Sequence, residues 1–350
     1  MERVDGRLIF SATDLINHLE CPHLTYLNIE VALGREEIER SRSDTTDLVA
    51  RKGDEHERGY LAQLIEEGRE VVEIGAVPAN GIEIGAGPTA GTEHKPRLDS
   101  AARKLEDTRL GARETVNAMK AGAEVIYQGV LFDGVRWRGH SDFLHRVETP
   151  SALGPFSYEV ADTKLARRVK PYFLLQLCFY SELVELIQGV APERMHVVLG
   201  TRETETFRVA EFAAYYRSVK HGFEAVVGVD PSAGGPVSSA VSATYPEPVE
   251  HCGPLGSGLS ATYPEPVEHC ALCSWEEHCA ARRDADDHLS LVARIQRSQR
   301  TRLVEHGIET LTQLAATEPA DGPKRIGAGA FATLRAHARL TLSQRASGEP

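Results

Sequence analysis

The sequence predicts an α/β fold, since segments with a helical pattern alternate with strand-like segments along the chain. Three observations lead to this prediction. Helical patterns precede a group of three strand-like runs, a helix follows that group, and two further strands follow the helix. The first two strands are joined around Asp133-Gly134, a dipeptide typical of a hairpin turn. The 350 residues, 41% of them hydrophobic, suffice for one large domain with a small appendage or for two domains.

Two helices are predicted in the first part of the chain. Ser11 suits the N-cap of the first helix, and Asp14, three residues on, is its capping-box partner. Cys21 falls at the end of this helix, directly before Pro22. A longer helix is predicted over residues 46–68, where five side chains share much of one face: Leu48, His56, Tyr60, Leu61 and Leu64.

The remaining elements follow in order. An imperfect ten-residue repeat at Val72–Gly91 is rich in glycine and proline and predicts a loop or an irregular hairpin. After it we expect a helix at 110–122, two strands within 124–147, a strand at 156–166, a helix at 171–189 and two strands within 194–212. Residues 228–269 are rich in Gly, Pro, Ser and Val, which predicts a loop. Beyond Cys279 the pattern is helical to near Gln344.

Charge and hydropathy narrow the function classes. No run approaches the eighteen or so apolar residues of a membrane span, and the N-terminus lacks the apolar core of a signal peptide, so we expect a cytoplasmic protein. The net charge of −12 is unevenly distributed, with −16 over residues 1–288 and +5 over residues 289–345. The basic tail fits either a solvated helix face or a phosphate-binding surface.

Three of the six cysteines are clustered in a C-x2-C-x5-C pattern: Cys270, Cys273 and Cys279. In a reducing compartment, such clustering indicates a metal or iron–sulfur site rather than disulfides. The candidates for a fourth ligand are Cys21, Cys252, His269 and His278. The eleven residues Ser242–Cys252 recur at Ser260–Cys270, which indicates a duplication within an exposed loop. Cys252 is then a spare copy, and Cys252→Ser is expected to leave the metal content unchanged.

A second candidate site lies on the predicted strands. Asp142 ends the hairpin, and Asp162 and Lys164 form a D-x-K pattern twenty residues later. Residues i and i+2 of a strand project from the same face, so this carboxylate and ammonium point into one site. Two carboxylates from adjacent strands can hold a divalent cation that polarises a phosphate and activates a water, while a lysine stabilises the transition-state charge. The alternative is a solvated strand edge.

Three more side chains could join this second site. Gln176 and Tyr180 lie four residues apart on one face of the helix at 171–189. His56 lies on the helix at 46–68, which could cross the site. Taken singly, His56 is more often a partly buried structural histidine and Tyr180 more often a core residue.

These motifs, in this order, resemble the RecB-type nucleases of the PD-(D/E)XK superfamily, in the iron–sulfur branch that includes AddB and the CRISPR-associated exonucleases. The resemblance covers about residues 8–285 and is carried by "HLECPHLTYL", "GDEHERGYL", "GHSDFL", "DTK", "QLCFY" and the cysteine pattern. It implies a restriction-endonuclease-like core, with a mixed central sheet flanked by helices, an iron–sulfur staple and a small helical C-terminal appendage.

The resemblance also implies roles for single residues. A Mg²⁺ or Mn²⁺ ion would be bound by the main-chain carbonyl of Thr163 and three side chains: His56, Asp142 and Asp162. Lys164 would be the catalytic lysine, and the DNA strand would be placed by Gln176 and Tyr180. A [4Fe–4S] cluster would be held by Cys21, Cys270, Cys273 and Cys279.

The implied domains are a nuclease domain at 1–285, with insertions near 72–98 and 228–260, and a helical tail at 286–345 with a faint likeness to a helix-hairpin-helix. Related nuclease modules are followed by a helicase or an RNase H-like exonuclease domain. The leading hypothesis is a metal-dependent DNA exonuclease, acting on single strands or ends in repair, recombination or defence, with DNA and a helicase as partners. One alternative is a non-catalytic DNA-binding or assembly module with a structural metal site. The other is a zinc protein using Cys270, Cys273, His278 and Cys279.

Overall fold

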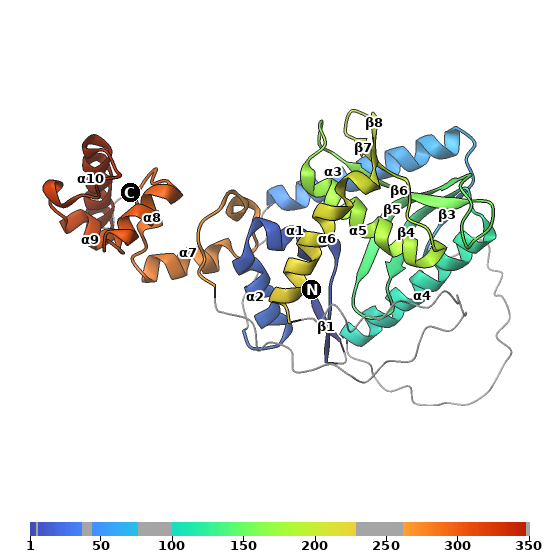
Figure 1. Cartoon of the computed structure of the whole chain (residues 1–350), viewed down its shortest axis with the longest axis horizontal. Coiled ribbons are helices and arrows are strands. Elements are labelled where there is room, and N and C mark those ends of the chain that lie inside the picture. Colours follow the sequence, from blue (N-terminus) through green and yellow to red (C-terminus); the bar gives the residue numbers. More distant parts are fainter. Residues whose placement is uncertain (5, 37–43, 76–99, 229–261, 348–350) are drawn as a thin grey trace. The chain divides into compact units, whose positions relative to one another are not determined.

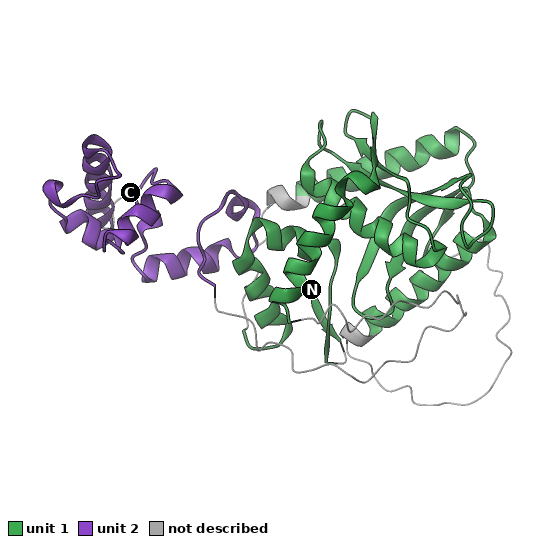
Figure 2. Cartoon of the chain, in the orientation of Figure 1, with its two compact units in different colours: residues 1–36, 44–260 green, residues 37–43, 261–350 purple. Residues whose placement is uncertain are grey.

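The computed structural model describes residues 1–4, 6–36, 44–75, 100–228 and 262–347, and it divides the chain into two compact units (Figure 2). Unit 1 comprises residues 1–36 and 44–260, and unit 2 comprises residues 37–43 and 261–350. The division falls before the clustered cysteines rather than after residue 285, so these cysteines belong to the same unit as the helical tail. Most of the repeat at 72–91, most of the loop at 228–269, and Cys252 lie outside the described residues.

Helices and strands alternate in unit 1 (Figure 1). The first elements are β1 (Glu2–Val4), β2 (Arg7–Ile9), α1 (Ala12–Glu20), α2 (Pro22–Ala32), α3 (Asp44–Glu66), β3 (Val71–Glu73) and α4 (Ser100–Ala121). They are followed by β4 (Val125–Phe132), β5 (Arg138–Val147), β6 (Ser157–Lys164), α5 (Pro171–Gln188), β7 (Arg194–Leu199), β8 (Thr204–Arg208) and α6 (Val209–Val226).

A six-stranded sheet in the order β3-β4-β5-β6-β7-β8 forms the centre of unit 1. The pairs β3–β4 and β6–β7 are parallel, and the other three pairs are antiparallel. The sheet is mixed and flanked by helices, which confirms the α/β prediction. At the turn between β4 and β5, Gly134 has a φ of +83°, and one Asp133 carboxylate oxygen accepts the backbone N–H groups of residues 135–137. The predicted hairpin is therefore confirmed.

Helices cover both faces of this sheet. On one face, Val160 of β6 shares a hydrophobic cluster with Leu177 of α5. On the other face, Ala161 of β6 shares a cluster with Leu64 of α3. Because successive strand residues point to opposite faces, β6 residues of the same parity as Val160 project toward α5. This parity decides where the polar residues at the end of β6 lie.

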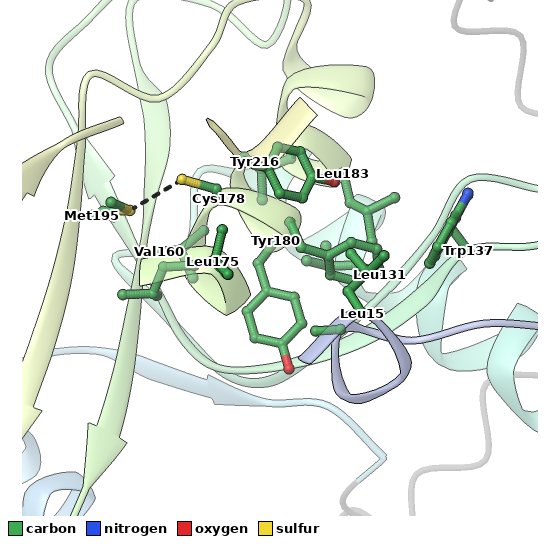
Figure 3. Packing of buried hydrophobic residues seen from close by; sticks show 14 of the residues in the cluster. Leu15, Leu131, Trp137, Val160, Leu175, Cys178, Tyr180, Leu183, Met195 and Tyr216 are labelled. Atoms are coloured by element: carbon green, nitrogen blue, oxygen red, sulfur yellow. Dashed lines mark hydrogen bonds between the residues drawn. The ribbon is translucent and has the colours of Figure 1, made fainter. Parts of the chain in front are cut away.

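The larger core lies on the α5 side of the sheet (Figure 3). Leu175 and Leu183 of α5 are buried there with Val160. The Cys178 Sγ lies 4.0 Å from the Met195 Sδ, and burial raises the pKa of Cys178 to about 12. Cys178 therefore belongs to the core as a small apolar residue.

The first helices follow the sequence pattern with one exception. The Ser11 N–H donates to the Asp14 carboxylate at 2.9 Å, which is the bond that the predicted capping-box partner makes, and the Ser11 hydroxyl donates to the same oxygen at 3.0 Å. In α3, Leu64 is buried, but Leu48 is 48% exposed. The predicted apolar face of this helix therefore packs on the sheet only in its C-terminal part.

Unit 2 is helical. It contains η2 (Glu268–Leu272), α7 (Glu276–Ala285), η3 (Leu289–Leu291), α8 (Arg297–Glu305), α9 (Leu311–Ala316), η4 (Pro319–Asp321) and α10 (Ala328–Ser347). A separate core of buried side chains joins η3, α8, α9 and α10, with Leu303, Leu311, Leu314, Phe331 and Leu334 at its centre. The tail beyond residue 286 thus forms a packed helical body.

Candidate functional site

Asp142, in the middle of β5, and Asp162, near the end of β6, come together at the end of the ladder between these strands. These strands form an antiparallel ladder that runs from Val147 opposite Ser157 to Phe143 opposite Ala161. Asp142 and Asp162 are the next residues on the two strands, so they leave the ladder side by side. Asp162 is 1% exposed and has the parity of Val160, which places it on the α5 side of the sheet. The two predicted acids therefore lie on neighbouring strands, where the β5–β6 ladder ends.

Thr163 fixes the Asp142 side chain. The Thr163 backbone N–H and hydroxyl both donate to Asp142 Oδ2, at 2.7 and 2.8 Å. Two hydrogen bonds to one oxygen hold the carboxylate in a single orientation. Sequence reasoning assigned Thr163 only a main-chain carbonyl, and it missed this positioning role of the amide and hydroxyl.

Lys164 forms an ion pair with Asp162. Its ammonium group also lies 5.5 Å from the centre of the Phe173 ring, within reach of a cation–π interaction. Burial acts to lower the pKa of Lys164, but the charges of Asp162 and Asp142 outweigh it and raise the pKa above its ordinary value. The lysine is therefore a fixed positive charge at neutral pH.

Gln176 and Tyr180 reach the same cluster from α5. The Gln176 side-chain amide donates to Asp162 Oδ1 at 3.3 Å and to the Tyr180 hydroxyl at 2.9 Å. Burial and the nearby charge of Asp162 raise the pKa of Tyr180, so its hydroxyl stays protonated. The Tyr180 ring belongs to the hydrophobic core that α5 forms with the sheet (Figure 3). The helix thus supplies two neutral polar groups to the acids.

Tyr180 packs closely on β5 because Gly139 lacks a side chain. A Cβ added at Gly139 would lie 2.6 Å from Tyr180 Cε1, closer than carbon atoms can approach without a shift. The ring is buried and cannot move away freely, since 6% of the residue is exposed. Gly139 is therefore required for the position of Tyr180.

A third acid, Glu57 of α3, interacts electrostatically with Asp142, and sequence reasoning missed it. Burial and the charge of Asp142 raise the pKa of Glu57, while hydrogen bonds with Tyr127 and Gln128 act to lower it. The Gln128 amide donates to Glu57 from a backbone with φ of 55°, an uncommon conformation for a residue other than glycine. The sequence signal was weak, because Glu57 is one of several acids on α3.

His56, the predicted α3 ligand, has another partner. Its Nε2 lies 3.3 Å from the carbonyl oxygen of Val198 on β7. It also lines a small hollow together with Tyr60 and Arg202. The structure thus gives the neighbouring residue, Glu57, the closer electrostatic link to the aspartates.

The acids repel one another, and this shows in Asp162. Burial, followed by the charge of Asp142, raises the pKa of Asp162 from 3.8 to about 7, even though Lys164 acts to lower it. Three carboxylates beside one ammonium group leave the cluster with excess negative charge, which a divalent cation would balance. Carboxylate oxygens are also the donors that Mg²⁺ and Mn²⁺ prefer, so the cluster fits such an ion by its chemistry.

The three clustered cysteines lie around η2 and α7 in unit 2. The Val267 N–H lies 3.4 Å from the Cys270 Sγ, and the Cys273 N–H donates to the Cys270 carbonyl at 3.1 Å. Cys279 is 8% exposed on α7. Cys21 lies in unit 1, between α1 and α2, so the identity of the fourth ligand stays a prediction. Soft thiolates in this spacing suit iron–sulfur clusters and zinc alike.

Over the residues that the structure describes, no three His, Cys, Asp or Glu side chains are gathered tightly enough to hold a metal ion. Comparison with models of known protein families and with curated proteins gave no match for this chain. None of the helices in the described ranges is both long and apolar enough to cross a membrane.

Proposed function

We propose that this chain is a metal-dependent deoxyribonuclease that hydrolyses phosphodiester bonds in single strands or at DNA ends, in DNA repair, recombination or defence. One observation carries the proposal: Asp142 and Asp162 meet where the β5–β6 ladder ends, with Lys164 paired to Asp162. Such a site combines oxygen donors for a hard cation with a positive charge for a phosphate.

The acids would hold a Mg²⁺ or Mn²⁺ ion through Asp142 and Asp162, with Glu57 as a further negative charge nearby. When bound, such an ion polarises the scissile phosphate and lowers the pKa of a bound water. Thr163 orients the Asp142 carboxylate before any ligand arrives, which reduces the reorganisation that binding requires. Gln176 does the same for Asp162 through its side-chain amide.

Lys164 would act as an electrostatic group rather than as a base. Its raised pKa keeps the ammonium protonated at neutral pH. It can therefore stabilise the negative charge that develops on the phosphate oxygens in the transition state. Tyr180, also protonated, can donate a hydrogen bond to the DNA backbone near the same place.

The test is a cleavage assay with purified protein, Mn²⁺ and end-labelled single- and double-stranded DNA. The wild type should degrade DNA, and Lys164→Ala should lower the rate by about 100-fold or more. Lys120→Ala is the matched control, because Lys120 is an exposed lysine at the end of α4. Equal cleavage by the wild type and Lys164→Ala would refute the assignment.

A second candidate function is a DNA-binding or assembly module without catalysis. The observation that favours it is the Lys164–Asp162 ion pair, because it engages the catalytic lysine and one proposed metal ligand with each other. This function predicts DNA binding that weakens steeply with salt and no cleavage with Mg²⁺ or Mn²⁺. The same end-labelled DNA, assayed for binding and for cleavage, separates the two functions.

We also propose that the clustered cysteines bind a [4Fe–4S] cluster, with Cys21 as the fourth ligand. The spacing of Cys270, Cys273 and Cys279 supports this proposal, and zinc bound with His278 is the alternative. Anaerobic purification followed by metal analysis tests it. Iron and sulfide in equal amounts would support the cluster, whereas zinc without iron would overturn it.

A further inference from the structure

The eleven-residue segment that occurs twice in the sequence, here called the phrase, has its second copy at residues 260–270. Within unit 2, part of this copy makes contacts of the kind that a bound peptide would make. Its residues Tyr263, Pro264 and Glu265 lie before the cysteines, and their partners lie after them in the sequence. The Arg283 guanidinium donates to the Pro264 carbonyl oxygen at 3.2 Å, and both residues are buried. This contact fixes the backbone of the phrase against α7.

Glu265 is bound by two side chains. Arg300 donates to one of its carboxylate oxygens at 2.8 Å, and His288 Nε2 lies 3.3 Å from the other. Arg300 is 8% exposed, so its charge has been largely removed from water and depends on the carboxylate. The hydrogen bond from His288, followed by the contacts with Arg300, lowers the pKa of Glu265 to about 2 against the effect of partial burial.

Tyr263 makes the third contact. Its ring centre lies 5.0 Å from that of His288, and its hydroxyl interacts with the Asp286 carboxylate. An aromatic ring, a backbone carbonyl and a carboxylate are thus recognised by one set of side chains. We call this set the phrase-binding surface: Arg283, Asp286, His288 and Arg300.

The first copy of the phrase carries the same three residues, Tyr245, Pro246 and Glu247, within eleven identical positions. We propose that the phrase-binding surface is a peptide-recognition site that accepts either copy, so that residues 242–252 compete with residues 260–270 for one site. Because the recognised atoms are identical, the local contacts do not distinguish the copies. The difference between them comes from the connecting chain.

The connecting chain gives the second copy a modest advantage. Eighteen residues separate Pro264 from Arg283, and 36 separate Pro246 from Arg283. Doubling a flexible connection disfavours the longer one by about threefold. Only the second copy has a further cysteine three residues after its own, so any metal bound by Cys270 and Cys273 would favour it further.

The test is a mutant cycle on the glutamates of the two copies in the full chain. Trp137→Phe in every variant leaves Trp275, a buried residue of unit 2, as the single tryptophan of the chain, and its fluorescence then reports denaturant unfolding of unit 2. All samples contain a chelator.

We expect Glu265→Gln to shift the unfolding equilibrium by about threefold, because the first copy replaces the second. Glu247→Gln alone should shift it by less than about twofold, and the two together by about tenfold or more.

A deletion of residues 242–259 removes the first copy and the seven residues between the two copies. In this background, Glu265→Gln alone should cost about tenfold, because no second carboxylate is present. The matched control is Glu268→Gln with Glu250→Gln, since Glu268 is an exposed acid of the same phrase. If Glu265→Gln lowers the stability of unit 2 as much with the first copy present as with the first copy deleted, the surface does not accept the first copy. If the double variant is as stable as the wild type, the surface does not recognise the glutamate at all.

Discussion

Two carboxyl groups, Asp162 in unit 1 and Glu265 in unit 2, lie in opposite environments. Asp162 is buried beside Asp142 and Lys164, and its pKa rises to about 7. Glu265 lies between His288 and Arg300, and its pKa falls to about 2. Each forms an ion pair, but the neighbours of Asp162 include a second acid, whereas those of Glu265 are basic.

The difference separates a candidate site from a structural contact. Where the folded protein disfavours the charge of an acid, a bound cation stabilises that charge. Such an acid is therefore a candidate cation ligand. An acid that is fully compensated by its neighbours gains nothing further and serves to hold the chain together. Four predictions test this contrast.

The largest effect is expected from removing the charge of Asp162. Asp162→Asn should lower Mn²⁺-dependent cleavage by about 100-fold or more, since a proposed metal ligand is lost. At pH 8 without metal, the same change should stabilise unit 1, because it removes a buried and repelled charge. Glu265→Gln should instead destabilise unit 2. Denaturant unfolding of both variants checks this contrast, and it fails if Asp162→Asn lowers the stability of unit 1 at pH 8.

The next effect concerns the packing that places Tyr180 beside Asp162. Gly139→Ala should destabilise unit 1 by about 1–3 kcal/mol, because the new methyl group overlaps the Tyr180 ring. Gly53→Ala on α3 is the matched control: a Cβ there meets nothing within 4 Å, and alanine is the better helix former. Thermal unfolding measures both. Equal stability of the two variants would show that the close approach at Gly139 is not required.

A smaller effect distinguishes the two α3 residues. Glu57→Gln should weaken Mn²⁺ binding by about tenfold, since a negative charge near the ion is lost. His56→Gln should change it less if the histidine serves only its partner on β7. Titration calorimetry on the two variants decides between them, and a larger loss from His56→Gln would restore the histidine as the α3 ligand.

A fourth prediction concerns the dependence of stability on pH in the absence of metal. The folded protein keeps a proton on Asp162 that the unfolded chain loses above its ordinary pKa of 3.8. This residue therefore makes the stability of unit 1 fall as the pH rises from about 4 to 7. Glu265 has a lowered pKa, so its contribution to unit 2 is present above about 4.5 and is lost as the pH falls toward 2. Denaturant unfolding measured at a series of pH values should therefore show the stability of unit 1 falling between about pH 4 and 7 and that of unit 2 rising between about pH 2 and 4.5.

Much of unit 1 could be predicted because its signals are local. Alternation on a strand puts Asp162 and Lys164 on one face, and the Asp133-Gly134 turn fixes the hairpin that carries Asp142. Glu57 could not be predicted, because its role depends on how α3 crosses the sheet and on the unusual backbone of Gln128. Leu48 is exposed for a similar reason: the helical pattern predicts an apolar face of α3, but not how much of that face packs on the sheet.

The grouping of the cysteines with the tail could not be predicted either. It depends on contacts such as Glu265 with Arg300, which join residues 35 positions apart. Composition marks the segment before the cysteines as a loop, and no local pattern indicates which helix it packs against. The start of unit 2 therefore depends on contacts between residues far apart in the sequence rather than on local turn or loop residues.

The most direct test of the acidic cluster is the thermal unfolding of the metal-depleted protein at pH 8, with and without Mn²⁺, for the wild type and for Asp162→Asn. We predict that Mn²⁺ raises the unfolding temperature of unit 1 in the wild type and leaves that of Asp162→Asn unchanged, because ligand binding stabilises only the state that binds. An equal response of the two proteins, or no response in either, would contradict a cation site at Asp142 and Asp162.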